Sequence, residues 1–333
     1  MTRHWKERPE GGGRFAIWLI RCIAHYGGRT VARLCLYPIT LYFVAVRGPE
    51  RAASRAYLAR ALGRPARLSD AFRHVHTFAS TILDRVFLLG GRLSNFDVTV
   101  SGLDAVHHEL DKRRGLLLFG SHLGSFEVLR VLARQRPDYV IRVVLDKAHN
   151  AVMTQLLDAL NPEIAARVID AGQDGPSVAM AIKQATDDGE LVALLVDRAR
   201  PAEPSLPAPF LGHLAPFPTA PWLIASALKV PVVLAFGLYR GGNRYDLVFE
   251  AFSEGFAIPR QQRAQALYAL IQRYAGRLEH HARNAPYNWF NFYDFWMRDD
   301  DDPQALPDVA AIPDAAVQRR TAAMHGLGAG GGR

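Results

Sequence analysis

The stretch GLLLFGSHLGSFEVLR, residues 115–130, decides the fold prediction for this chain. An uninterrupted apolar run, residues 116–119, ends at Gly120, which is typical of a short buried strand. From Phe126 onward the apolar residues have helical spacing. A strand, a tight turn and the start of a helix together favour a functional site, because free backbone N–H groups at a helix start stabilise negative charge.

Two polar side chains at this turn, His122 and Glu127, form a candidate chemical pair. On one continuous helix a spacing of five residues would point them about 140° apart. They converge only if His122 lies in the turn and Glu127 lies in the first helical turn. A histidine oriented by a carboxylate is a general base at neutral pH. The alternative is a structural histidine beside an acid that favours the helix dipole, and these residues alone do not separate the two.

Two serines in the same turn, Ser121 and Ser125, are alternative nucleophiles. The centre of the pentapeptide from Gly120 to Gly124 is His122, however, where a hydrolase of the nucleophile-elbow type has serine. We therefore rank a serine nucleophile below the general base.

Two further apolar runs, both read as strands, are followed by polar residues. Asp197 and Arg198 follow one run, and Lys147 and Asn150 follow the other. Open α/β sheets place ligands at the carboxyl ends of their strands, so all four residues are candidates for the same site. The alternatives are a structural ion pair for the first two and a helix-capping loop for the second two.

The composition bounds the fold and the partners. With 333 residues, of which 49% are hydrophobic, the chain can bury a sizeable core. The two cysteines, Cys22 and Cys35, fit neither a disulfide framework nor a metal site, and we expect no metal and no bound cofactor. The net charge of +8 favours an acidic partner, either anionic lipid or an acidic carrier protein. Nucleic acid is not expected, because the chain has no zinc-finger spacing and no RNA-recognition motif.

The N-terminal segment, residues 15–46, is apolar but interrupted by arginines and by two glycines. Its longest uncharged run, residues 34–46, is shorter than the ~20 residues that a membrane-spanning helix needs. Tyrosines, a tryptophan and arginines in this segment suit a helix that lies in the membrane interface. The alternative is a helical hairpin packed on a soluble core.

We expect a single α/β domain with a mixed central sheet flanked by helices, preceded by the membrane-associated helical element. A hairpin is expected at residues 231–250, and Pro-rich residues 201–209 are read as an extended loop. The predicted divisions are a flexible basic start at 1–13, the membrane-associated element at 14–48, the α/β domain at 49–298, and an acidic, then Pro/Ala/Gly-rich disordered tail at 299–333.

His122 and Glu127, with four residues between them and a short apolar strand before them, resemble the His-x4-Asp/Glu (HX4E) signature of the glycerolipid-type acyltransferase superfamily. The later blocks, Asp197-Arg198 and the aromatic run at 286–296, occur in the order of its lipid A late-acyltransferase branch. The sequence NFYDFW, residues 291–296, is most similar to relatives encoded with aryl-polyene and xanthomonadin-type pigment pathways. The sequence Thr219-Ala220-Pro221 stands where the family often has a glycine before the proline, a departure that bears on the acceptor pocket.

This resemblance implies acyl transfer from a thioester, carried by acyl carrier protein, to a hydroxyl of a lipid or glycolipid at the cytoplasmic face of a bacterial inner membrane. His122 would be the general base, and Glu127 would orient it. N–H groups near Gly124 and Ser125 would hold the oxyanion, and Arg198 would bind a phosphate or help with the oxyanion. Two alternatives remain open: a hydrolase with the same site, and a non-catalytic lipid-binding protein.

Overall fold

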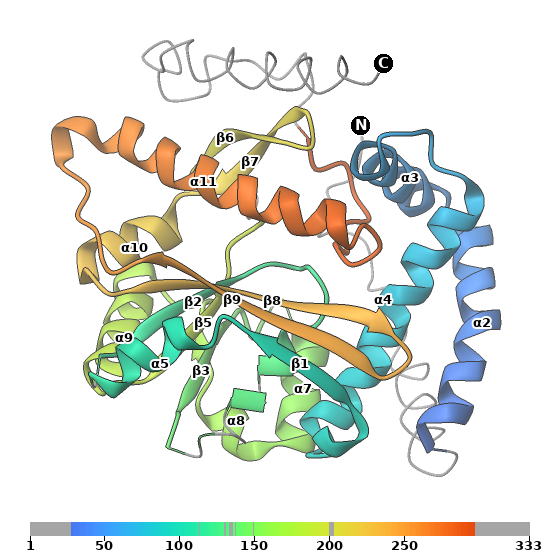
Figure 1. The fold of residues 1–333 in the computed structure, drawn as a ribbon, viewed down its shortest axis with the longest axis horizontal. Coiled ribbons are helices and arrows are strands. Elements are labelled where there is room, and N and C mark those ends of the chain that lie inside the picture. Colours follow the sequence, from blue (N-terminus) through green and yellow to red (C-terminus); the bar gives the residue numbers. More distant parts are fainter. Residues whose placement is uncertain are drawn as a thin grey trace, which may run out of the picture.

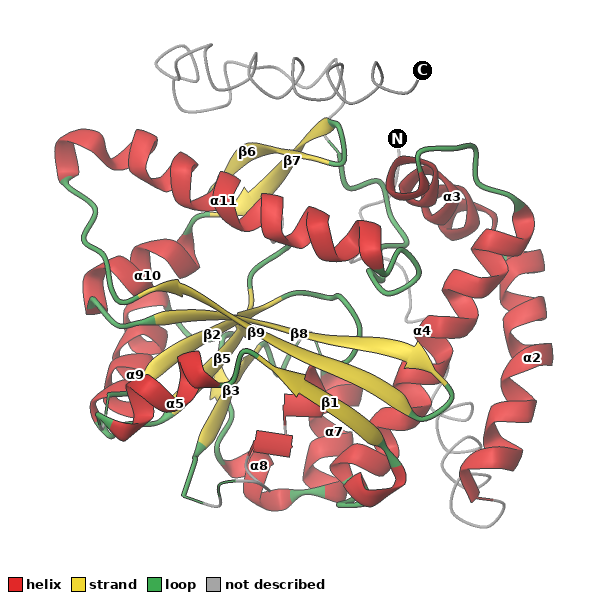
Figure 2. Ribbon diagram, viewed as in Figure 1, coloured by secondary structure: helices red, strands yellow, loops and turns green. Residues whose placement is uncertain are grey.

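The computed structural model describes residues 28–112, 114–129, 131–132, 136, 138–148, 150–199 and 203–296. The predicted start at 1–13, residues 14–27 of the predicted membrane element and the predicted tail at 299–333 lie outside this part of the chain. A seven-stranded sheet occupies the centre, with helices on both of its faces (Figures 1 and 2). The predicted α/β class with a mixed central sheet is confirmed.

The central sheet has the spatial order β1-β9-β8-β2-β5-β3-β4. Only β8 and β9 pair antiparallel, and the other neighbouring strands are parallel. Its strands are β1 (Asp97–Ser101), β2 (Leu116–Gly120), β3 (Ile141–Leu145), β4 (Ile169–Asp170), β5 (Leu191–Leu195), β8 (Val232–Gly241) and β9 (Arg244–Ser253), and a separate hairpin contains β6 (Ser205–Phe210) and β7 (His213–Pro218).

The helices of the described chain surround this sheet. They are α2 (Gly28–Val46), α3 (Gly48–Leu62), α4 (Leu68–Leu89), α5 (Asp104–Asp111), α7 (Ala151–Leu160), α8 (Pro162–Ala166), α9 (Gly175–Asp187), α10 (Ala220–Leu228) and α11 (Arg263–Asn284), with 3-10 turns η2 (Leu93–Asn95), η3 (Phe126–Leu129) and η4 (Arg260–Gln262). The helix expected after the turn at residues 120–125 begins as the short 3-10 helix η3.

Strand β2 is buried along its whole length, because helices cover both faces of the sheet. Leu117 and Phe119 pack on one face with α10 and α11, and Leu116 and Leu118 pack on the other with α4 and α5. A strand alternates its side chains between two faces, so an uninterrupted apolar run is what this doubly covered position requires. The end of β2 is thus held from both sides.

The Pro-rich segment predicted as a loop at 201–209 instead contributes β6. Strand β6 pairs antiparallel with β7, and Pro207 lies opposite Pro216. Proline lacks a backbone N–H, so the two prolines occupy a non-hydrogen-bonded pair of the antiparallel ladder. The ladder therefore loses no hydrogen bond at this position. Leu211 and Gly212 make the tight connection with φ values of 51° and 86°.

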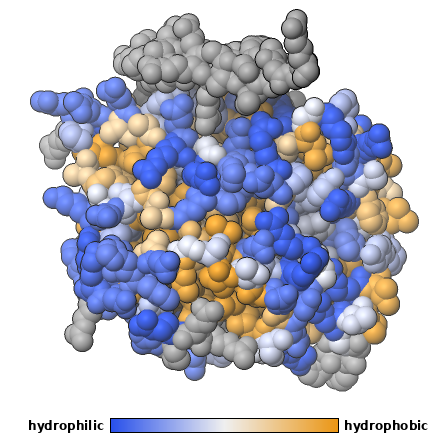
Figure 3. All heavy atoms as spheres, viewed as in Figure 1, coloured by the Kyte–Doolittle hydropathy of each residue, from blue (hydrophilic) through white to orange (hydrophobic). Residues whose placement is uncertain are grey.

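Helix α2 has two different apolar faces. One face packs on the domain through Ala32, Leu36, Thr40 and Val44. Among the described residues, α2 is the one helix whose length and apolar composition would allow it to cross a membrane. Figure 3 shows apolar side chains at the right-hand edge, where α2 lies. The exposed apolar residues of this helix are Val31, Leu34, Tyr37, Ile39, Leu41, Tyr42 and Val46.

Candidate active site

The turn after β2 packs directly on β8, because two glycines let the backbones approach. Gly124 has a φ of +77°, and a Cβ on it would lie 1.9 Å from the carbonyl oxygen of Gly237. A Cβ on Gly237 would lie 2.1 Å from the carbonyl oxygen of Ser125. The N–H groups of Gly124 and Ser125 donate to the carbonyl oxygens of Asn288 and Gly237, each at 2.8 Å. Side chains at these glycines would push the turn off the sheet.

His122 and Asp197 meet because β2 and β5 are neighbouring parallel strands. Gly120 pairs with Leu195 in this register, and His122 and Asp197 each follow two positions after these paired residues, so they lie side by side. Nδ1 of His122 is 2.8 Å from Oδ1 of Asp197, and the backbone N–H of His122 donates to Oδ2 at 3.1 Å. The carboxylate is fully buried, whereas 40% of the His122 side chain is exposed.

The surroundings favour a neutral imidazole beside an ionised carboxylate. Burial and the charge of Arg198 lower the pKa of His122 below its usual value of 6.5, against the opposing effect of Asp197. Burial alone would raise the pKa of Asp197, but His122, Arg198 and Trp289 outweigh it and hold that pKa well below its usual range. A carboxylate only accepts hydrogen bonds, so Nδ1 carries the proton and Nε2 keeps a free lone pair.

The aromatic segment at the end of the described chain holds this pair in place. Nε1 of Trp289 donates to Oδ2 of Asp197 at 3.0 Å, and the N–H of Phe290 donates to the carbonyl oxygen of His122 at 3.0 Å. Arg198 donates through Nη2 to the carbonyl oxygen of Phe290 at 2.6 Å. The sequence pattern identified this segment only as an aromatic run and did not predict these polar contacts.

A second buried histidine supports Trp289 from behind. Nε2 of His74, on α4, lies 2.9 Å from the carbonyl oxygen of Trp289, and Nδ1 lies 2.8 Å from Oγ of Ser54, on α3. Burial lowers the pKa of His74 to about 4, so the ring is neutral at pH 7. Because a carbonyl only accepts, Nε2 donates to Trp289 and Nδ1 accepts from Ser54. The sequence pattern did not assign His74 to the site.

Glu127 lies close to the turn, but it is not the carboxylate that contacts His122. Its Oε1 is 2.6 Å from Nε of Arg85 on α4, and its Oε2 accepts from Oγ of Ser125 at 2.9 Å. The expected hydrogen bond from His122 to Glu127 is thus replaced by the bond to Asp197. The physical reason is the strand register, which places Asp197 next to the imidazole, whereas η3 directs Glu127 toward α4.

The backbone groups expected to form an oxyanion hole are already engaged. Gly124 and Ser125 both donate their N–H groups to carbonyl oxygens, so neither is free for a substrate oxygen in this geometry. The serine side chains are also buried: Ser121 is 6% exposed and Ser125 is 1% exposed. A serine nucleophile in this turn would have to become accessible before it could react.

Lys147 and Asn150 lie in the connection between β3 and α7. Strand β5 separates β3 from β2 in the sheet. The backbone N–H of Lys147 donates to Oδ1 of Asp170 at 3.2 Å, and Nδ2 of Asn150 donates to the carbonyl oxygen of Asp146 at 2.9 Å. These contacts are local, and within the described ranges none of them reaches His122. The structure therefore does not bring these two residues together with the pair.

The arrangement at the carboxyl end of β2 is suited to acid–base chemistry. A neutral imidazole with one bonded nitrogen and one free nitrogen removes a proton from a hydroxyl group or from water. The adjacent guanidinium of Arg198 lies over the rings of Trp289 and Tyr293 and is 18% exposed. In the part of the chain that the structure describes, no group of three or more His, Cys, Asp or Glu residues is placed to hold a metal ion.

Comparison with known families gives this site its context. A family model described as bacterial lipid A biosynthesis acyltransferase matches residues 80–298, a range that includes the turn, β5 and the aromatic segment. No individual curated protein matches the chain in sequence. Because the matched range covers well over half of the 333 residues, the chain belongs to the bacterial lipid A biosynthesis acyltransferase family.

Proposed function

We propose that this protein transfers an acyl chain from a thioester on acyl carrier protein to a hydroxyl group of a membrane lipid or glycolipid. Family membership supports acyl transfer to lipid. The observation that carries the site assignment is the hydrogen bond between His122 and Asp197, which leaves the second imidazole nitrogen without a partner among the described residues, in a partly exposed ring. The net charge of +8 favours the acidic carrier protein as the donor.

His122 acts as the general base in the proposed reaction. Nε2 takes the proton of the acceptor hydroxyl while the oxygen attacks the thioester carbonyl carbon. The tetrahedral intermediate then collapses, the carbon–sulfur bond breaks, and the imidazolium returns its proton to the leaving thiolate. The products are an ester and the free thiol of the carrier, and His122 ends in its starting form.

Neighbouring charges stabilise the two charged species of this reaction. Asp197 faces the imidazolium that forms after proton transfer, and its fixed position also keeps the proton of neutral His122 on Nδ1. We assign Arg198 to the oxyanion or to a phosphate of the substrate, because a guanidinium is a strong donor to either. Glu127 assists indirectly: it anchors the turn through Ser125 and Arg85.

The apolar helix and the aromatic motif support our proposal for the location and the acceptor. We place the protein at the cytoplasmic face of a bacterial inner membrane, attached through the element predicted at residues 14–48, with residues 49–298 as the catalytic domain. The exposed apolar face of α2 favours attachment in the membrane interface. The run at residues 291–296 favours an aryl-polyene-type or fatty acyl chain and an outer-membrane lipid as the acceptor.

The test is acyl transfer from a panel of acyl carrier protein thioesters, with membrane extract as the acceptor. We expect labelled lipid with the wild type and a loss of about 10²–10⁴-fold with His122→Ala, the range for removal of a general base. Transfer by His122→Ala at a rate near that of the wild type would contradict the mechanism. Loss of thioester without labelled lipid would favour the hydrolase, and lipid binding without any turnover would favour the non-catalytic binder.

A further inference from the structure

A groove lies away from the catalytic turn, where the end of α2 meets α3 and the start of α4. Its volume of about 460 Å³ falls in the range of small-ligand sites. Apolar side chains form one part of its wall and two arginines form the other. The lining residues are Leu41, Val44, Ala45, Arg51, Arg55 and Leu68.

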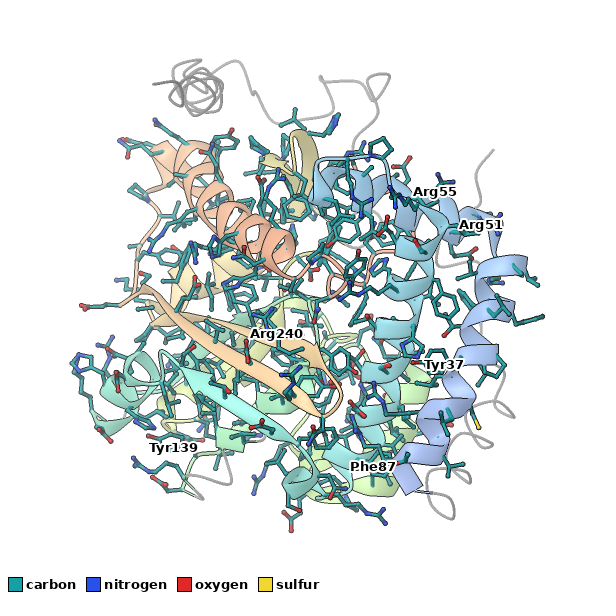
Figure 4. The ribbon with its side chains drawn as sticks, turned by 45° about the vertical axis from the view of Figure 1, so that its right-hand side comes forward. Tyr37, Arg51, Arg55, Phe87, Tyr139 and Arg240 are labelled. Atoms are coloured by element: carbon teal, nitrogen blue, oxygen red, sulfur yellow. The ribbon has the colours of Figure 1, made fainter. Side chains whose placement is uncertain are left out.

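The two arginines in this groove retain guanidinium N–H groups that can donate hydrogen bonds to a ligand. Arg51 uses Nη1 to bond the carbonyl oxygens of Val44 and Ala45 at the end of α2. Arg55 uses Nε to bond the carbonyl oxygen of Ala66 at 3.0 Å. Among the described residues, no hydrogen bond or ion pair engages the Nη groups of Arg55 or Nη2 of Arg51. These backbone contacts fix the two guanidinium groups beside each other on α3 (Figure 4).

The nearby carboxylates do not neutralise this pair, because each has an arginine of its own. Glu50 pairs with Arg47 at 3.2 Å, and Asp70 pairs with Arg64 at 2.8 Å. The groove therefore keeps a net positive charge. Guanidinium groups recognise phosphate oxygens through paired N–H donors, so the complementary group is a phosphate.

The apolar part of the groove continues onto the exposed face of α2. Leu41 is 63% exposed and Leu68 is 58% exposed, and both line the groove. Tyr42 and Val46 on the same helix are 66% and 58% exposed. A ligand with a phosphate attached to apolar chains matches this combination of cationic and apolar surfaces.

We propose that this groove binds the phosphate headgroup of an anionic membrane phospholipid, whose acyl chains lie along the exposed face of α2. The site is separate from the reacting groups, yet it shares helices with them: Ser54, next to Arg55 on α3, bonds the His74 that supports Trp289. A lipid held here therefore sets the orientation of the catalytic domain on the membrane. The proposal rests on the membrane attachment proposed above, and its test does not require turnover.

The experiment is vesicle flotation of the full chain with phosphatidylcholine vesicles, with and without added phosphatidylglycerol. We expect the wild type to prefer the anionic vesicles. The partition coefficient of Arg55→Gln onto these vesicles should be about fivefold lower than that of the wild type, which is the effect of one basic side chain near the surface. Arg55→Lys, which keeps the charge, should restore part of the loss. Arg167→Gln is the matched control, because Arg167 is exposed at the end of α8, far from α3 (Figure 1).

Several outcomes would overturn the proposal. An equal loss for Arg55→Gln and Arg167→Gln would mean that only the total charge matters, and equal wild-type binding to both vesicle types would mean that no headgroup is recognised. A dimer in sedimentation that Leu41→Ser dissociates would assign the face to a second copy. Leu41→Ser should otherwise weaken binding to both vesicle types. If the wild type binds no vesicle while acyl transfer to a detergent-dispersed acceptor persists, membrane attachment fails and the catalytic proposal stands.

Discussion

Two buried aspartates, Asp197 and Asp84, have similar surroundings and different uses. Both are 0% exposed, and both have arginine and aromatic partners. Asp197 accepts from Nε1 of Trp289 and lies near Arg198. Asp84, on α4, accepts from the hydroxyl of Tyr245 at 2.9 Å and from two nitrogens of Arg29 at 2.7 and 2.9 Å.

The difference lies in the remaining partner of each carboxylate. Asp197 bonds a histidine with a partly exposed ring, which can gain and lose a proton near neutral pH. Asp84 bonds Arg29 and lies 3.6 Å from Arg33, and arginine does not titrate in this range. Both arginines also donate to the carbonyl oxygen of Gly242, so this cluster joins α2, α4 and the β8–β9 hairpin. Under the proposed mechanism, a buried carboxylate therefore serves catalysis where its partner can change its charge, and assembly where its partner cannot.

Asp197→Asn tests the catalytic side of this comparison and should have the largest effect. The amide has no charge to stabilise the imidazolium, and its N–H₂ group cannot accept from Nδ1. We expect kcat to fall by about a thousandfold or more. Steady-state acyl transfer measures this loss. A variant with near wild-type kcat would remove Asp197 from the mechanism.

Asp84→Asn tests the structural side. Removal of the charge leaves Arg29 partly buried without its counter-ion, so we expect the free energy of unfolding to fall by about 3 kcal/mol. Urea unfolding measures this change. Acyl transfer per folded molecule should stay close to that of the wild type, and a thousandfold loss of kcat with unchanged stability would reverse the two assignments.

Trp289→Phe asks how much the indole N–H contributes to the position of Asp197. The ring remains and one hydrogen bond to a charged group is lost, so we expect kcat to fall about tenfold. Trp222→Phe is the matched control: Trp222 is also fully buried, and its Nε1 has no hydrogen-bond partner among the described residues. Equal losses in the two variants would assign Trp289 to packing alone.

The smallest expected effect is a shift in the pH profile of kcat/KM, and this shift reports specifically on the pKa of His122. The base must be neutral, so activity rises with pH through the pKa of His122 and is constant above it. That pKa is lowered, so the midpoint should lie below 6.5. Arg198→Gln removes a charge that lowers this pKa, and the midpoint should move upward. A downward shift in this variant would contradict the electrostatic account.

The sequence predicted the local parts of the site well. Residues 116–119 form the expected buried strand, and His122 lies in the turn after it. Asp197 and Arg198 follow a neighbouring parallel strand at the same edge of the sheet. These features depend on apolar runs and on the general geometry of parallel sheets, which a sequence pattern carries by itself.

The partners within the site depend on contacts between distant segments, which the local pattern does not specify. The choice of Asp197 over Glu127 follows from the register of β2 against β5. The position of Trp289 follows from an antiparallel bridge to Leu123. His74 was the most accessible missed signal, because it occupies the apolar face of an amphipathic helix, where a neutral, hydrogen-bonded ring is the usual outcome.

The bridge between Leu123 and Trp289 also determines the stage of synthesis at which the site can assemble. The ribosome completes His122, and later Asp197, long before it reaches the segment that bonds them both. A nascent chain that stops before residue 286 has the base and its carboxylate but lacks the groups that hold them. His122 and Asp197 therefore gain these two hydrogen bonds only after synthesis has passed Phe290.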